Sequence, residues 1–520
     1  MATAAEIGEA QLVRRISRAR LSAVVFTGGV GTLATEIAAS RLLAPYFGSS
    51  TVVWANIIGL TLLYLSAGYW LGGKWADRRP EPIVLGRIVL VAAFFIAATP
   101  FIARPVLDLA LEGFDAVSVG AVVGSFFAAL AIFAVPVTLL GTVSPFAIRL
   151  ALDDVREAGA VAGRLYALST VGSILGTFLS AIVTIPLVGT QRTMLGSAAL
   201  LALAAALLLG GRWHVATIAL CGLLFVPAGT IKASEGLVWE TESAYQYVQV
   251  VERPDGSRAL RLNEGVAVHS VWRPDTVLTG GVWDTFLVVP PLLGRPAERV
   301  LILGSAGGTI GRAYGRFYPE ARVDGVEIDG EVSEAGRRFL GLADNPNVRT
   351  ITADARPYLE STEERYDVII GDAYRQPYIP FYLTTQEFFE LAREHLRPGG
   401  ILALNVAAVP GDERLSEAIG STLLTVFPEA WSWRPLRFNE ILLAFDRPVG
   451  AGALRSRAGA LDPELSSLVP IFRERLEPVR KTREPLTDDR APVEWLTDQM
   501  ITSYIARGGE LDEDHLPTAP

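Results

Sequence analysis

Acidic side chains follow three short apolar runs in the second half of the sequence. Glu327, Asp354 and Asp372 each come at the end of such a run, and a glycine-rich stretch, residues 304–311, directly follows a fourth. At one edge of a parallel sheet, carboxylates at strand ends bind ribose hydroxyls, and a glycine turn lets the backbone approach the ligand. The spacing therefore predicts a nucleoside site, with Glu327 and Asp354 at the nucleoside edge and Asp372 in the pocket wall.

The elements needed to hold these carboxylates begin at residue 299. Apolar runs alternate with amphipathic helical stretches, and we expect strands at 299–303, 322–326, 348–352, 366–370 and 401–405. This alternation predicts a doubly wound parallel sheet. S-adenosylmethionine fits the site better than NAD, because the turn at 304–308 departs from G-x-G-x-x-G and the acidic residues follow the order of a methyltransferase-type domain.

The first half of the chain has the composition of a membrane protein. The whole sequence is 50% hydrophobic and only 19% charged, and charged side chains are sparse within residues 21–231. A membrane-spanning helix takes about 20 apolar residues. Seven runs approach that length, at 21–44, 52–71, 83–102, 117–140, 165–188, 193–209 and 215–231. Glycine and other small residues within the runs favour a closely packed bundle.

Together these patterns predict the fold class: an α-helical transmembrane bundle followed by a small β-domain and an α/β Rossmann-like, methyltransferase-type domain. We expect a cytoplasmic segment at 1–20, the multi-pass transmembrane domain at 21–231, the small β-domain at 232–290, the nucleoside-binding domain at 291–450 and a helical tail at 451–520.

Charge excludes several function classes. The net charge is −9 and its negative part lies in the soluble half, which argues against nucleic acid as a partner. The single cysteine, Cys221, excludes disulfides and thiolate zinc sites. We expect no metal and no prosthetic group.

Arginine and lysine near the span ends predict a cytoplasmic amino terminus. We expect a multi-pass protein of the cell membrane with its soluble half on the cytoplasmic side. Seven spans would instead leave that half outside, so three interpretations stay open: one run is re-entrant, the pair around residues 210–212 is miscounted, or the soluble half is external.

An ionisable residue, Glu36, lies inside the first predicted span. One interpretation is a structural contact with Arg41 or Asn56; the other is a role in substrate passage. Residues 72–79, GGKWADRR, resemble the cytoplasmic loop between the second and third helices of major facilitator transporters.

Several longer motifs resemble one family, the polyamine aminopropyltransferases (spermidine synthases), in the branch with an amino-terminal membrane domain. The matching stretches are 36–48, 68–73, 245–248, 260–263, 326–329, 383–389 and 488–494. The resemblance implies transfer of an aminopropyl group from decarboxylated S-adenosylmethionine to putrescine, giving spermidine. It also implies a homodimer.

The resemblance assigns roles to individual residues. Glu327 would hold ribose, Asp354 the adenine amino group and Gln246 the aminopropyl end of the donor, while Asp284 would lie near the amine. The full set expected to bind the co-substrate is Gln246, Gly304, Gly307, Glu327, Asp354, Ala355 and Asp372. Asp372 and Asp284 are the candidate catalytic residues, because a carboxylate can accept the proton of the attacking amine.

Two positions depart from the family pattern. Arg375 stands where the soluble enzymes have a second Asp, and Gly307 replaces an Asp of their glycine turn. Three interpretations of Arg375 stay open: it points outward and Asp372 or Asp284 is the base, it binds an anionic acceptor, or the site is not catalytic.

Tyrosines follow Asp372 in the sequence. With Arg375 and Asp284, Tyr374 and Tyr378 are the candidates for binding the amine substrate, because aromatic faces suit a cationic methylene chain. A loop packed on its own domain is the alternative.

Two further functions remain open at this point. An S-adenosylmethionine-dependent transferase acting on another acceptor is favoured by Arg375. A transporter or sensor regulated by the nucleoside, without catalysis, is favoured by Glu36 and the transporter-like loop.

Overall fold

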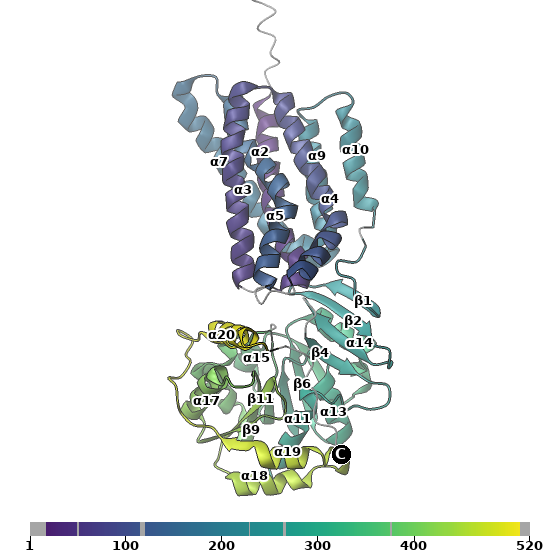
Figure 1. Ribbon diagram of the computed structural model, residues 1–520, viewed down its shortest axis with the longest axis vertical. Helices are drawn as coiled ribbons and strands as arrows, with labels where there is room; N and C mark the ends of the chain where they lie inside the picture. Colours follow the sequence, from purple (N-terminus) through teal and green to yellow (C-terminus); the bar gives the residue numbers. More distant parts are fainter. Residues whose placement is uncertain are drawn as a thin grey trace, which may run out of the picture. The chain divides into compact units, whose positions relative to one another are not determined.

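The computed structural model describes residues 17–48, 51–114, 120–227, 229–263, 267–374 and 377–509. The chain divides into two compact units. The helical unit comprises Met1–Ala233 and Thr241–Tyr247, and the α/β unit comprises Ser234–Glu240 and Val248–Pro520. Each unit is described by itself (Figure 1).

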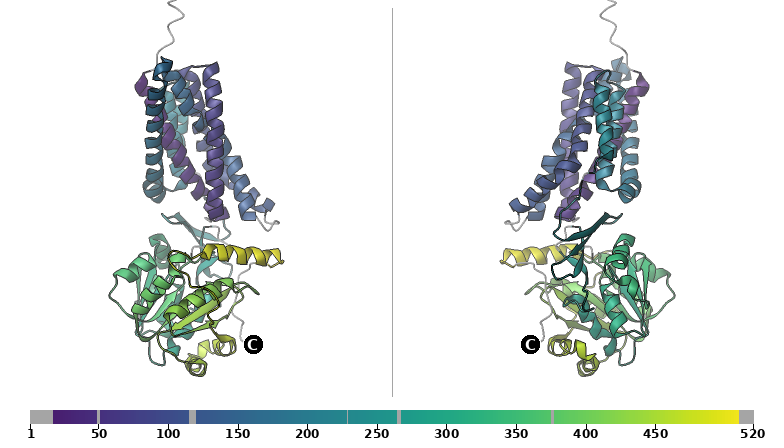
Figure 2. Two further views of the ribbon diagram at one scale, coloured as in Figure 1. Left: turned by 90° about the vertical axis from the view of Figure 1, so that its left-hand side faces the viewer. Right: turned by 90° about the vertical axis from the view of Figure 1, so that its right-hand side faces the viewer.

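The helical unit is a bundle of long helices that run side by side (Figures 1 and 2). Its helices are α2 (Arg18–Phe47), α3 (Thr51–Arg78), α4 (Pro82–Phe114), α5 (Gly120–Gly141), α6 (Val143–Ala151), α7 (Ala158–Phe178), α8 (Ile185–Val188), α9 (Thr190–Ala206) and α10 (Trp213–Gly222), with short helical turns η1 (Val155–Glu157), η2 (Leu179–Thr184) and η3 (Leu223–Phe225).

Within the described residues, five helical stretches are long and apolar enough to cross a membrane: Arg18–Phe47, Val53–Arg78, Pro82–Ala110, Gly124–Ala151 and Val155–Val188. The sequence has two further apolar runs, which fall on α9, with 17 residues, and α10, with 10. Both are shorter than the roughly 20 residues of a typical span. α9 packs against α2 and α4 inside the bundle, so its apolar residues are covered largely by protein.

Glycine permits the closest helix contact in the bundle, between α2 and α7. A Cβ atom at Gly29 would lie 2.2 Å from the carbonyl oxygen of Ser169, and one at Gly172 would lie 2.2 Å from that of Phe26. Any larger residue would force the two helices apart, which is the role expected of small residues in a membrane bundle.

A small sheet has the order β1-β2-β3-β4. Its strands are β1 (Leu237–Glu242), β2 (Tyr247–Glu252), β3 (Arg258–Leu262) and β4 (Val268–Trp272). Strands β2, β3 and β4 are antiparallel and, from Val248 onward, belong to the α/β unit. Ser270 of β4 contacts the glycine turn, because its Oγ accepts a hydrogen bond from Gly307 N at 2.9 Å.

The large sheet has eight strands in the order β12-β10-β11-β9-β8-β5-β6-β7. Its parallel part is β5 (Arg299–Leu303), β6 (Arg322–Glu327), β7 (Val348–Thr352), β8 (Tyr366–Gly371) and β9 (Leu396–Ala407), and its antiparallel edge is β10 (Glu429–Trp433), β11 (Asn439–Phe445) and β12 (Leu476–Pro478). The predicted fold class is confirmed, and the five predicted strands fall on β5 to β9.

Helices cover both faces of this sheet. They are α11 (Val282–Thr285), α12 (Val289–Leu292), α13 (Thr309–Phe317), α14 (Gly330–Phe339), α15 (Ala355–Ser361), α16 (Gln386–Glu394), α17 (Arg414–Val426), α18 (Ala451–Arg457), α19 (Leu468–Arg475) and α20 (Val493–Ala506). Side chains of β5 alternate between two cores: Leu301 and Leu303 pack with α16 and α17, and Val300 and Ile302 with α13 and α19.

Candidate active site

The strand order brings the predicted acidic residues to one edge of the sheet. Strands β8, β5, β6 and β7 are neighbours in that order, and parallel strands end at the same edge. Asp372, the glycine turn, Glu327 and Asp354 therefore follow one another along the carboxyl edge.

The glycine turn begins where the ends of β5 and β8 meet. Gly304 has φ +85°, and a Cβ atom there would lie 2.5 Å from the carbonyl oxygen of Asp372. Gly304 N donates to Val326 O at 2.9 Å, and Asp372 N donates to Leu303 O at 2.8 Å. Only glycine both adopts this positive φ and leaves room for the carbonyl oxygen of Asp372. Gly304 therefore allows the ends of β5 and β8 to stay in contact.

Glu327 is bound to the glycine turn by its carboxylate. One oxygen accepts from Ala306 N at 2.9 Å and the other from Asp329 N at 3.0 Å. The residue is 8% exposed, and burial raises the pKa of its carboxyl group to about 7, against the opposing effect of these hydrogen bonds. Each carboxylate oxygen has a second lone pair that can accept a ligand hydroxyl.

Asp354 caps the amino end of α15. Its Oδ1 accepts from Arg356 N at 3.2 Å, and its Oδ2 accepts from the hydroxyl of Tyr382 at 3.1 Å. The neighbouring Ala355 is buried. The Tyr382 contact ties the loop after β8 to the end of β7.

Asp372 is half-buried at the end of β8 and has two polar side-chain partners. Its Oδ1 accepts from the side-chain amide of Asn405 at 2.8 Å, and Trp283 is its other hydrogen-bond partner. Burial raises the pKa of Asp372 to about 7, although both hydrogen bonds lower it. Asn439 donates to the amide oxygen of Asn405 at 2.9 Å, which orients Asn405 with its NH2 group toward Asp372.

Asn405, Asn439 and Trp283 are site residues that no sequence prediction named. A signal existed for Asn405 alone, since it follows the apolar run at 401–404 and so had to lie near the same edge. Trp283 and Asn439 reach the site only through the tertiary fold.

Asp284 is bound within its own turn. Its carboxylate accepts from Thr279 N at 3.0 Å, from the Thr279 hydroxyl at 3.0 Å and from Gly280 N at 2.7 Å. It is 4% exposed, and burial raises its pKa. These contacts fix the turn before Trp283.

The tyrosines after Asp372 bind their own unit. The hydroxyl of Tyr374 donates to the carbonyl oxygen of Asn405 at 3.0 Å, and that of Tyr378 donates to Asp498 on α20 at 2.7 Å. This geometry favours the alternative of a loop packed on its own domain. Arg375 lies outside the described residues.

Gln246 belongs to the helical unit rather than the α/β unit. Its backbone N–H donates to the hydroxyl of Ser243 at 2.9 Å. Its predicted role at the aminopropyl end of the donor therefore stays a prediction.

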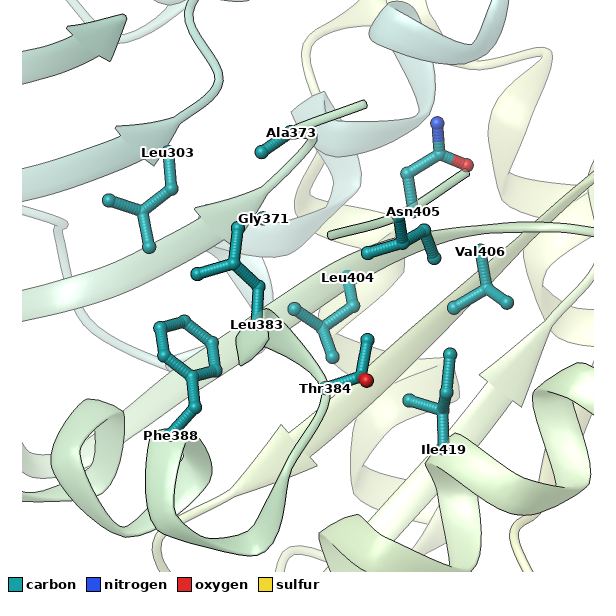
Figure 3. Close-up of a pocket in the computed structure, with 11 residues that line it drawn as sticks. Leu303, Gly371, Ala373, Leu383, Thr384, Phe388, Leu404, Asn405, Val406 and Ile419 are labelled. Carbon is teal, nitrogen blue, oxygen red and sulfur yellow. The ribbon is translucent and has the colours of Figure 1, made fainter. Parts of the chain in front are cut away.

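An apolar pocket of about 360 Å³ lies beside Asp372 in the α/β unit (Figure 3). Figure 3 shows the amide of Asn405 at the rim of a group of apolar side chains. The lining residues share the carboxyl ends of β5, β8 and β9 and the helices that cover them: Leu303, Gly371, Ala373, Ile379, Leu383, Thr384, Phe388, Leu404, Asn405, Val406 and Ile419. Gly371 and Ala373, which flank Asp372 in the sequence, both line this apolar pocket.

This combination defines an α/β domain of the methyltransferase type: a parallel sheet with a glycine turn after one strand and carboxylates after its neighbours. Residues 286–432 match the family described as "Spermine/spermidine synthase domain", and that segment contains β5 to β9 and all three edge carboxylates. Over this segment the α/β unit is similar to that family.

The chain is also similar to curated proteins. A protein named "Probable polyamine aminopropyl transferase" from Bifidobacterium longum (strain NCC 2705) is 35% identical over 293 residues, covering 52% of this chain and 64% of the relative. A "Polyamine aminopropyltransferase" from Vibrio vulnificus (strain CMCP6) is 29% identical, covering 38% and 67%. The chain thus spans 64% to 67% of the length of these two relatives.

Among solved structures, a probable spermidine synthase from Corynebacterium glutamicum ATCC 13032 is 18% identical, with a TM-score of 0.38 and coverage of 55% of this chain and 99% of that chain.

Proposed function

We propose that the α/β unit transfers an aminopropyl group from decarboxylated S-adenosylmethionine to a small amine, with putrescine as acceptor and spermidine as product. The observation that carries the proposal is Asp372, a carboxyl group with pKa about 7 at the carboxyl edge of the segment that matches the family. A group of this pKa exchanges protons near neutral pH, as a general base must.

The donor fits the remaining edge. Glu327 and Asp354 lie on neighbouring strands beyond the glycine turn, where carboxylates accept hydrogen bonds from ribose and from an exocyclic amine. When ionised, these carboxylates also favour a donor that carries a positive sulfonium.

The reaction requires a neutral amine. The nitrogen lone pair forms the new C–N bond at the methylene next to the sulfonium, and the C–S bond breaks with its electrons on sulfur. A neutral thioether nucleoside leaves. The amine, with an unperturbed pKa near 10, passes one proton to Asp372.

Asp372 fits the role of base better than Asp284. The carboxylate of Asp284 accepts three hydrogen bonds from Thr279 and Gly280, whereas that of Asp372 is held from one side by Asn405. We assign Asp284 to positioning the turn that carries Trp283, which hydrogen-bonds Asp372.

The pH dependence of transfer tests the assignment. We expect kcat, measured at saturating donor and putrescine with mass-spectrometric detection of spermidine, to fall about tenfold per pH unit below pH 7, because only ionised Asp372 accepts a proton. Asn405→Leu removes a hydrogen bond that lowers the pKa of Asp372, so its profile should move to higher pH. Absence of spermidine in the parent contradicts the function, and an unshifted Asn405→Leu profile contradicts the role of Asn405.

The helical unit would anchor the enzyme in the cell membrane. Its geometry also helps to assign the side of the membrane on which the α/β unit lies. At one end of the bundle Arg18 pairs with Asp153 at 3.4 Å and Arg149 with Asp77 at 3.3 Å. At the other end of α2, the Tyr46 hydroxyl donates to the carbonyl oxygen of Ile231 at 2.7 Å. The chain therefore leaves the bundle at the end opposite to Arg18.

Basic residues gather at the Arg18 end and mark it as cytoplasmic: Arg18, Arg20, Lys74, Arg78, Arg79, Arg149, Arg156 and Arg164. This supports the external alternative for the α/β unit over the cytoplasmic side expected from the sequence. The homodimer stays a prediction.

Cysteine labelling tests sidedness. In a Cys221→Ser background, we expect Glu363→Cys on the α/β unit to react with a membrane-impermeant maleimide in intact spheroplasts, and Arg156→Cys to react only after lysis. Both positions are exposed. The reverse pattern would restore the cytoplasmic placement.

A further inference from the structure

A cavity of about 260 Å³ lies inside the helical unit, between α2, α3 and α5. Its lining residues recur at helical spacing on each helix: Thr35, Glu36 and Ala39 on α2, Ile57, Leu60, Thr61 and Tyr64 on α3, and Ala129, Phe133 and Val137 on α5. Glu36 and Tyr64 lie near the middle of their helices, where an ionisable group is costly and indicates a function by default.

The carboxylate of Glu36 has no partner among the described residues. Neither contact considered from the sequence is formed: Arg41 donates to the backbone carbonyl of Ala244, and Asn56 donates to Ser125 at 3.1 Å. A structural ion pair or hydrogen bond therefore does not account for Glu36.

Two further polar atoms at the cavity are unpaired. The hydroxyl groups of Thr35 and Tyr64 are buried, at 0% and 6% exposure, and neither has a hydrogen-bond partner within the described part of the chain. Buried hydroxyls are rarely left unpaired in folded proteins. The cavity thus offers one carboxylate and two hydroxyls to a ligand.

We propose that this cavity is a binding site for a small alkylammonium ion. A primary ammonium has three N–H donors and no acceptor, which matches the oxygens of Glu36, Thr35 and Tyr64. The aliphatic lining suits a short methylene chain, and the rings of Tyr64 and Phe133 can contact the cation.

Other ligand classes fit less well. An anion would be repelled by Glu36. Hard metal ions such as Mg²⁺ and Ca²⁺ take six or more oxygen ligands, twice as many groups as the unpaired ones here.

Binding of n-butylamine to the full chain in nanodiscs at pH 7 tests the proposal. We expect a saturable site, distinct from the acceptor site proposed for the α/β unit, that Glu36→Gln weakens about tenfold or more, because a charge-assisted contact is lost, and that Tyr64→Phe weakens less. Butan-1-ol, the neutral analogue, should not compete. Asp153→Asn, an exposed carboxylate of the same unit, should bind as the parent does.

The outcome is independent of the transferase. Asp372→Asn in the α/β unit should leave butylamine binding at this site unchanged, so failure of either proposal can be recognised alone. Equal affinity for n-butylamine in the parent and in Glu36→Gln overturns the proposed site. Glu36→Gln removes an unpaired buried charge and should not lower Tm; if it fails to fold, undiminished binding by Tyr64→Phe overturns the proposal.

Discussion

Asp372→Asn is expected to lower kcat for aminopropyl transfer about 10²- to 10⁴-fold, the range typical of a lost general base. The amide keeps the size of the carboxyl group and can still accept a hydrogen bond from Asn405, but it cannot accept the amine proton. Donor affinity should change only a few-fold, since Asp372 lies across the glycine turn from Glu327. Single-turnover kinetics with saturating donor measure the loss.

Asp284→Asn is the matched control for this prediction. It makes the same chemical change on a buried aspartate next to Trp283. The carboxylate of Asp284 is bound by Thr279 and Gly280. We expect a lower Tm, because two backbone N–H groups lose a carboxylate partner, and a smaller loss of kcat with the parent's pH profile. If Asp284→Asn abolishes the fall of kcat below pH 7 and Asp372→Asn retains it, Asp284 is the general base and Asp372 the positioning residue.

The places of the three acidic residues at the strand ends were predictable, because all strands of a parallel sheet end at the same edge. Each apolar run from 299 to 405 became a strand, and a residue that follows a parallel strand must lie at the carboxyl edge. Glu327, Asp354 and Asp372 could therefore be assigned to one edge from the sequence alone. Their surroundings could not, because Asn439 and Trp283 come from an antiparallel strand and a turn with no periodic signal.

The carboxyl-terminal region shows a second limit of sequence patterns. Residues 451–520 had the composition of a helical tail, yet Leu454 and Phe472 are fully buried against the large sheet, and Phe472 contacts Trp433 edge to face at 5.1 Å. Short helices with two or three apolar residues give a weak periodic signal. The packing depends on the antiparallel strands β10 to β12, which the sequence analysis had not identified.

In the first half of the chain, hydropathy likewise locates the apolar runs but does not indicate which helices pack against them. The small residues of α2 and α7 were correctly associated with close packing, since Gly29 and Gly172 each touch the opposite backbone. The unpaired state of Glu36 was not visible in the sequence, where Arg41 and Asn56 stood at plausible spacing. Only the paths of α3 and α5 determine which side chains face Glu36.

Glu327→Ala is expected to weaken binding of decarboxylated S-adenosylmethionine about 100-fold or more, because two hydrogen bonds to a charged acceptor are lost, each contributing about 1.5–3 kcal/mol. Calorimetry on the full chain measures the affinity. Methylthioadenosine, the neutral product, separates the two ways in which Glu327 could act. A carboxylate that accepts the ribose hydroxyls affects both ligands equally, whereas one that acts on the sulfonium through its charge affects the donor alone.

Glu327 also accepts from Ala306 N and Asp329 N, so a loss of binding could come from a disordered glycine turn. Glu327→Gln separates these causes, because its side-chain oxygen still accepts one of the two backbone hydrogen bonds while the negative charge is absent. We expect it to retain the parent's Tm more closely than Glu327→Ala and still to bind both nucleosides weakly. Parent-like affinity for methylthioadenosine in both variants would mean that the ribose lies elsewhere along the edge, with Asp354 as the next carboxylate in line.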